Sequence, residues 1–286
     1  MALTAREESM HFSKIVVFLR GWSDAGGLAD TVLEAIQKRL PCQVVARMDM
    51  DVFVQASENR PTVHIQHGVL KDFHWPALEF YRPDDPTHHD MVFAFGPEPA
   101  MQWRRFVSEF ITVVTSWKCE ELLLVGSLYD HIFYDEIQIS GVAVNSLGYN
   151  LLRHWQCRPA FYQGPASVYS AILHELRRSP ITAVSLWAHV PFYLKGPHEL
   201  LVHAVMRIVG DLAHIEWNLD DLLVEWKSRE MEIEEILSQD PSLREQIRAL
   251  KKEGISSHGI ESQNKRAEVI NFQKFKKKGK NDVENS

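Results

Sequence analysis

The sequence has few cysteines and no long apolar run. Its three cysteines, Cys42, Cys119 and Cys157, lie far apart and include no Cys-x-x-Cys pair, which excludes a disulfide framework and indicates a reducing compartment. No stretch approaches the roughly 20 apolar residues that span a bilayer, and residues 1–9 are too polar for a signal peptide. These absences predict a cytoplasmic protein that has no membrane partner.

An excess of basic residues is also missing. The formal net charge is -7 at pH 7, which argues against nucleic acid as a general partner because phosphate binding needs a basic face. Lysines gather only in residues 254–286, where the apolar pattern stops, and we predict that this basic tail is disordered.

Histidine is abundant, but without the spacing of a metal site. The chain has 14 histidines and no His-Glu-x-x-His sequence, and the pairs that do occur differ from the common helical zinc pairs. We therefore predict no metal and no cofactor.

One turn near the start carries the clearest motif. Residues 15–19 are all apolar, a turn with Gly21, Gly26 and Gly27 follows, and apolar residues then recur at helical spacing from Leu28 to Leu40. A buried strand, a turn and a helix form half of a βαβ unit. Ligands of open α/β sheets bind outside the carboxyl ends of the strands, so this turn is a candidate binding position.

Buried strands separated by helical patterns predict a layered α/β domain with a largely parallel sheet. Further strands are expected at 42–48, 91–95, 122–125 and 181–187, with a half-exposed meander strand at 62–66 and an irregular or edge segment at 75–86. Only helical patterns follow Pro197, and Asp240-Pro241 is typical of a helix start. The expected organisation is a core at 12–215, a C-terminal helical extension at 216–253 and the tail at 254–286.

If the strands are parallel, their exit loops meet at one edge, and polar side chains converge there. The residues 126–130 and 188–193 are the expected exit loops of two strands. The candidate ligand-binding residues are Trp22, Ser23, Asp24, Gly26, Gly27, Ser127, Asp130, Trp187 and His189.

Two interpretations of the glycine turn stay open. The backbone of Gly26 and Gly27 could bind an anion, with Asp24 positioning a polar group. Alternatively, Asp24 or Ser23 caps the helix and the glycines permit close packing.

The same edge suggests a catalytic triad. Ser127 or Ser185 could combine with His189 and an aspartate, although neither serine lies in a Gly-x-Ser-x-Gly elbow. The alternative is a hydrogen-bonded structural histidine. We therefore assign no catalytic residue from the sequence.

Several sequence blocks, in their joint order, resemble the PAC2 family, the proteins similar to proteasome assembly chaperone 2. The blocks extend from about residue 12 to 253 and are Gly21-Trp22-Ser23-Asp24-Ala25-Gly26, Arg60-Pro61-Thr62, Pro97-Glu98-Pro99 with Trp103-Arg104-Arg105-Phe106, Gly126-Ser127-Leu128, Ser140-Gly141, Tyr162-Gln163-Gly164-Pro165, residues 184–193 and Asp240-Pro241.

The resemblance implies a three-layer α/β/α fold with a central mostly parallel or mixed sheet, similar to the phosphorylase/hydrolase-like architecture, and a C-terminal helical extension. It also implies pairing with a second copy or a related subunit, and no established enzymatic activity. Family members that dock on the proteasome end with a hydrophobic residue, a tyrosine and any residue. This chain ends Val283-Glu284-Asn285-Ser286, so the resemblance does not extend to proteasome docking.

From these observations we expect a non-enzymatic assembly or interaction protein that self-associates. The alternative is a protein, or an enzyme, that binds an anionic or nucleoside-like small molecule at the strand-end residues.

Overall fold

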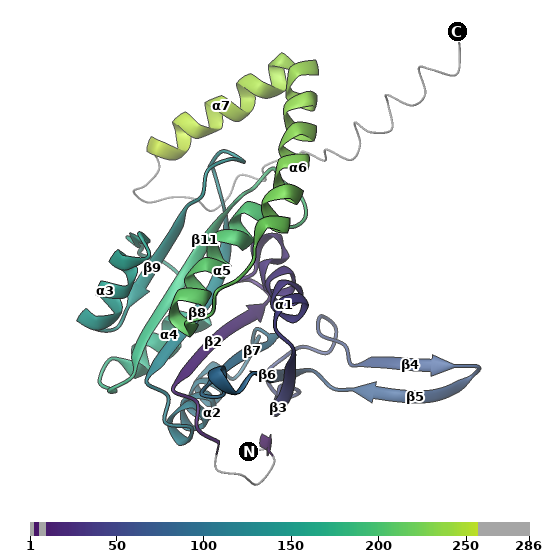
Figure 1. The fold of residues 1–286 in the computed structure, drawn as a ribbon, viewed down its shortest axis with the longest axis vertical. Helices are drawn as coiled ribbons and strands as arrows, with labels where there is room; N and C mark the ends of the chain where they lie inside the picture. Colours follow the sequence, from purple (N-terminus) through teal and green to yellow (C-terminus); the bar gives the residue numbers. More distant parts are fainter. Residues whose placement is uncertain (1–2, 6–9, 257–286) are drawn as a thin grey trace.

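The computed structural model describes residues 3–5 and 10–256 (Figure 1). The predicted basic tail lies outside the described residues from position 257 onward. Nine strands of the described chain form one sheet, in the order β1-β3-β6-β7-β2-β8-β11-β9-β10. Their bounds are β1 Leu3–Ala5, β2 Lys14–Arg20, β3 Cys42–Asp49, β6 Ala77–Pro83, β7 Met91–Pro97, β8 Glu121–Asp130, β9 Ile139–Ala143, β10 Arg158–Pro159 and β11 Thr182–Pro191.

The sheet is mixed, with a parallel centre. Strands β7, β2, β8 and β11 run parallel, whereas β6 and β3 are antiparallel to their neighbours and β9 is antiparallel to β11. The short edge strand β10 is parallel to β9. The central strands contain buried apolar runs at 15–19, 91–95 and 122–125, as expected for parallel strands that helices cover on both faces.

Helices cover both faces and form the other two layers (Figure 1). Helices α1 (Leu28–Arg39) and α5 (Glu199–Ala213) pack on one face, against Val16, Phe18 and Val125. Helices α2 (Trp103–Ser116) and α4 (Val168–Leu176) pack on the other. Helix α3 (Ser146–His154) lies beside β9, and short 3₁₀ turns are formed by η1 (Ala25–Gly27) and η2 (Pro86–His88). The predicted three-layer α/β fold is confirmed.

The structure corrects three local predictions. Strands β8 and β11 run on to Asp130 and Pro191, because they pair with each other without a break over that length. Residues 126–130 and 188–191 of the expected exit loops therefore lie within strands. The segment expected to be irregular contains β6, a strand of the main sheet whose Leu78 and Phe80 enter the core.

The third correction concerns the predicted meander strand. Strand β4 (Thr62–Gln66) pairs only with β5 (Val69–His74), so the two form a separate ribbon that projects from the body (Figure 1). Its turn, His67-Gly68, has positive φ at both residues, 51° and 76°, as tight hairpin turns require. Every residue of both strands is exposed.

The C-terminal extension consists of α6 (Asp220–Gln239) and α7 (Pro241–Ser256). The predicted helix start at Asp240-Pro241 is confirmed, since Asp240 Oδ1 accepts from the Leu243 N–H at 3.0 Å. The ring of Trp226 on α6 stacks on His198 of the core, with centroids 4.4 Å apart. Burial lowers the pKa of His198 to about 4.

The boundaries proposed between core, extension and tail stay a prediction. None of the described helices is both long and apolar enough to cross a membrane.

Candidate functional site

The glycine turn after β2 is fastened to β8 by buried hydrogen bonds. The Ser127 N–H donates to the Ser23 carbonyl at 2.8 Å, and Ser127 Oγ donates to the Ala25 carbonyl at 2.8 Å. The backbone N–H and hydroxyl of Ser23 both donate to Glu98 Oε2, at 3.0 and 3.1 Å. Both serines are buried, and these bonds account for their polar groups.

The other predicted residues of the turn are also engaged within the chain. Asp24 Oδ1 accepts from the Ala29 N–H in the first turn of α1 at 2.9 Å, although the N-cap residue of that helix is Gly27. Gly26 and Gly27 have φ values of 72° and 68°. The Gly26 N–H donates to Tyr129 Oη at 3.2 Å, and the Gly27 N–H to the Asp24 carbonyl at 3.4 Å. An anion at this turn would have to replace these bonds.

Asp24 is partly buried, and this position affects its protonation. Burial raises the pKa of its carboxyl from 3.8 to about 6, despite the hydrogen bond from Ala29. A raised pKa in the folded state means that stability is lost as the pH rises from about 4 to above 6.

We expect Asp24→Asn, which keeps the acceptor but removes the charge, to stabilise the protein at pH 8 by up to about 3 kcal/mol, since one pKa unit corresponds to about 1.4 kcal/mol. The gain should vanish at pH 4. Urea unfolding followed by tryptophan fluorescence measures both. Exposed Asp51 is the control, and Asp51→Asn should stay within about 0.5 kcal/mol at both pH values. A gain independent of pH would contradict the burial argument.

A second cluster surrounds His189 on β11. Its Nδ1 lies 2.7 Å from Asp130 Oδ2, and its Nε2 lies 2.9 Å from Ser140 Oγ. Gln138 Nε2 is 3.2 Å from the same Nδ1, and Gln138 Oε1 accepts from Arg158 Nη1 at 2.7 Å. Because a carboxylate only accepts, the shorter contact favours the proton on Nδ1, and Nε2 is left to accept the Ser140 hydroxyl proton. The longer contact of Gln138 Nε2 then joins two donors and is not a hydrogen bond.

The two clusters lie on opposite faces of the sheet. Successive side chains of a strand alternate between faces. Ser127 shares its face with Leu123 and Val125, toward α1 and α5. His189 shares its face with Ala183 and Trp187, toward α2 and α4. The strand-end residues therefore do not form one concave site that contains both Ser127 and His189.

An aromatic contact between Trp22 and Trp187 connects the two clusters. The ring centroids of Trp22 and Trp187 are 6.3 Å apart, edge to face, and Trp187 also packs on Tyr169 at 5.8 Å. Trp22 is 68% exposed. That any of these residues contacts a ligand stays a prediction.

The sequence offered Ser127 and Ser185 as possible partners of His189, and it assigned no catalytic residue. Neither Ser127 nor Ser185 is the serine that meets His189; Ser140 is. Ser140 could be found only by knowing that β9 lies beside β11, where Ser140 pairs with Trp187. The Gln138-x-Ser140 alternation is the available signal, because residues two apart lie on one face of a strand.

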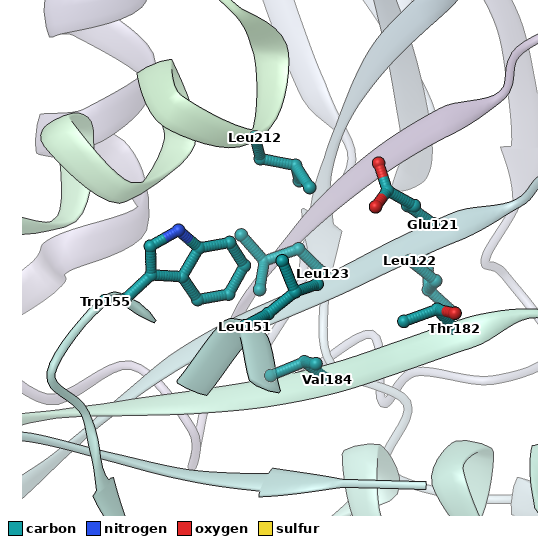
Figure 2. Close-up of a pocket in the computed structure, with 8 residues that line it drawn as sticks. All are labelled: Glu121, Leu122, Leu123, Leu151, Trp155, Thr182, Val184 and Leu212. Carbon is teal, nitrogen blue, oxygen red and sulfur yellow. The ribbon is translucent and has the colours of Figure 1, made fainter. Parts of the chain in front are cut away.

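A hollow lies at the opposite ends of β8 and β11, where these strands begin (Figure 2). Its walls are too close together to admit a water molecule. Its lining is mostly apolar, from Leu123, Leu151, Trp155, Val184 and Leu212, so we assign it no function. The part of the chain that the structure describes contains no group of three potential metal ligands in coordinating positions.

The fold and the site together define a class of protein: a three-layer α/β protein with a parallel-centred sheet, a turn locked onto the neighbouring strand and a helical C-terminal extension. The model of the PAC2 family matches residues 18–237, and the chain belongs to that family. No curated protein matches the sequence.

Solved structures of similar proteins agree with this assignment. A proteasome-assembly chaperone homologue of Mycobacterium tuberculosis is 26% identical, with a TM-score of 0.70 over 81% of this chain and 98% of its own. A PAC2 family protein of Streptomyces avermitilis is 24% identical, with a TM-score of 0.67 over 78% and 94%. PbaA of Pyrococcus furiosus, an archaeal homologue of a proteasome-assembly chaperone, has a TM-score of 0.57 at 15% identity over 85% and 99%.

Proposed function

We propose that this protein is an interaction and assembly protein that associates with further copies of itself through the β4–β5 ribbon. The observation that carries the proposal is the uncovered apolar face of this ribbon. Several solved relatives are described as proteasome-assembly chaperone homologues, which supports a role that depends on protein partners.

One face of the ribbon carries four apolar side chains. Val63 pairs with Phe73, and Ile65 pairs with Leu70, so these four side chains share one face. They are 46–60% exposed. The other face carries the pair of His64 and Asp72, with Nδ1 and Oδ2 3.5 Å apart. Apolar residues gathered on one exposed face are typical of an interaction surface.

A second copy of this chain fits the ribbon by its geometry. A two-stranded ribbon is marginally stable alone, and three or more strands with an apolar face are needed for independent stability. Both outer edges of the ribbon lack a partner strand within the described chain. The same ribbon from a second copy, related by a two-fold axis, would supply both the strands and the apolar cover.

The test replaces one cross-strand pair at a time. Val63→Ser with Phe73→Ser removes apolar groups from one face, and His64→Ser with Asp72→Ser changes the adjacent pair on the other face. Burying a large apolar side chain contributes about 1.5–3 kcal/mol, so we expect the first variant to weaken association by about tenfold or more, and the second to associate like the wild type. Light scattering after size exclusion, across a range of concentrations, measures the mass.

Two results would overturn the proposal. One is a wild type that keeps the single-chain mass of 33.0 kDa at every concentration. The other is equal weakening by the two double variants, since that would separate association from the apolar face.

A further inference from the structure

Ser140, His189 and Asp130 are linked in the order that nucleophilic catalysis uses. We propose that Ser140 is an activated nucleophile, with His189 as its general base and Asp130 as the group that orients the imidazole, and that this site hydrolyses carboxylic esters that carry an anionic group. The proposal does not depend on the ribbon, so either can fail alone.

The hydrogen bonds give each residue a distinct role. Asp130 Oδ2 lies 2.7 Å from His189 Nδ1, and His189 Nε2 lies 2.9 Å from Ser140 Oγ. With its proton on Nδ1, the neutral ring accepts the Ser140 hydroxyl at Nε2, which is the tautomer that a general base needs. Triads are recognised by this geometry rather than by position in the chain, so the absence of an elbow motif does not exclude it.

The three residues come from three neighbouring sheet positions and are held rigidly. Asp130 ends β8, His189 lies on β11 beside it, and Ser140 lies on β9 at the other side of β11. The His189 backbone N–H also donates to the Gln138 carbonyl at 2.9 Å. Regular strands position side chains more precisely than loops do.

The triad is partly shielded but within reach of solvent. The side chains of His189 and Asp130 are 11% and 25% exposed, and Ser140 is half-buried. A partly desolvated site strengthens the electrostatic interactions of the reacting groups.

The neighbouring residues indicate the class of ester. Arg158 on β10 is exposed and pairs in register with Ser140, so its guanidinium lies one strand away from the nucleophile on the same face. A guanidinium matches the geometry of a carboxylate. Trp187, which also pairs with Ser140, offers an apolar wall to the rest of the acyl group.

The reaction balances without any further reagent. Ser140 Oγ attacks the ester carbonyl carbon while its proton moves to His189 Nε2. The carbon–oxygen bond to the alcohol then breaks, and the alcohol leaves with that proton, so an acyl-serine remains. Water, deprotonated by His189, then attacks the acyl-serine, the bond between the acyl carbon and Ser140 Oγ breaks, and His189 returns the proton to Ser140 Oγ. The products are one carboxylic acid and one alcohol.

Labelling with a fluorophosphonate tests the nucleophile directly. We expect the wild type to gain one adduct, located at Ser140 by peptide mass spectrometry. Ser140→Ala should gain none. His189→Gln should lower the labelling rate by about 100-fold or more. Ser108→Ala is the control, because Ser108 is exposed on α2, away from the site, and it should react like the wild type.

A pair of ester substrates tests the substrate class. The mono-4-nitrophenyl ester of glutaric acid carries a carboxylate, and 4-nitrophenyl acetate does not. Arg158→Gln should raise KM about tenfold or more for the first ester alone, because the ion pair is lost. Equal KM values for the two esters in the wild type would overturn the assignment of Arg158.

Two results would overturn the assignment of Ser140 as the nucleophile. One is a folded wild type that gains no adduct, and the other is an adduct that persists in Ser140→Ala. If Ser140→Ala does not fold, Ser140→Cys replaces it. The new thiol should be alkylated by iodoacetamide at a rate that falls with His189→Gln, and an unchanged rate would overturn the role of His189.

Discussion

Replacing Tyr169 by phenylalanine is expected to lower the free energy of unfolding by about 2–4 kcal/mol, because two buried backbone groups lose their partner and each costs about 1–3 kcal/mol. Strands β2 and β8 pair only from Lys14–Phe18 and Glu121–Val125. Just beyond that pairing, Tyr169 Oη accepts from the Leu19 N–H at 2.9 Å and donates to the Val125 carbonyl at 3.0 Å.

The tyrosine therefore bridges two strands at the point where they separate. Urea denaturation, followed by circular dichroism, measures the loss. Tyr149→Phe on α3 is the control, because the Tyr149 ring is 46% exposed, and its effect should stay within about 0.5 kcal/mol. Equal effects of the two substitutions would mean that the Tyr169 hydroxyl does not bridge the strands.

Replacing Arg229 by leucine is expected to destabilise the protein by about 3 kcal/mol at pH 8, because it leaves a buried carboxylate without its counterion. Arg229 Nη2 lies 2.9 Å from Glu199 Oε1, and the Glu199 side chain is 8% exposed. Arg229 Nη1 also donates to the Pro197 carbonyl at 2.7 Å. These bonds connect α6 of the extension with the start of α5.

This loss should depend on pH. Burial raises the pKa of Glu199, and Arg229 opposes that rise. Without Arg229 the pKa rises further, so the destabilisation should grow as the pH increases and shrink toward pH 5. Thermal unfolding at both pH values measures the difference.

Two variants control for the buried charge. Glu199→Gln together with Arg229→Leu should recover most of the stability at pH 8. Arg244→Leu breaks an exposed pair with Glu234 on the same extension and should cost no more than about 1 kcal/mol. If Arg229→Leu were as mild as Arg244→Leu, the extension would not be anchored through Glu199.

Local sequence signals predicted the parts of the fold that local physics determines. The apolar run before Arg20 and the helical spacing after Gly27 specified the first strand, turn and helix. The carboxyl of Asp240 located a helix start, since its Oδ1 accepts from the Leu243 N–H at 3.0 Å, as expected of a capping residue.

The order of strands depends on contacts distant in sequence, and the sequence alone did not supply it. Strand β9 lies between β11 and β10, so Ser140 reaches His189 across 49 residues of chain. The strand alternation on β8 and β11 would have separated Ser127 from His189, but only if both strands had been predicted to continue past Gly126 and Trp187.

The ribbon is a similar case. The alternation of Val63 and Ile65 with His64 and Gln66 predicted a strand with one apolar face. The alternation predicts that one face is apolar, but it does not predict what covers that face. The structure places that face outside the core, and this is why we infer a second copy of the chain as its cover.

Hydrogen–deuterium exchange of residues 62–74, measured over a range of protein concentrations, tests self-association through the ribbon most directly. If two ribbons pair, their amide groups gain hydrogen bonds, and we expect protection of this segment to increase at least tenfold with concentration while the amides of β8 stay unchanged. Exchange of the ribbon amides that is fast and identical at every concentration would contradict the proposed assembly.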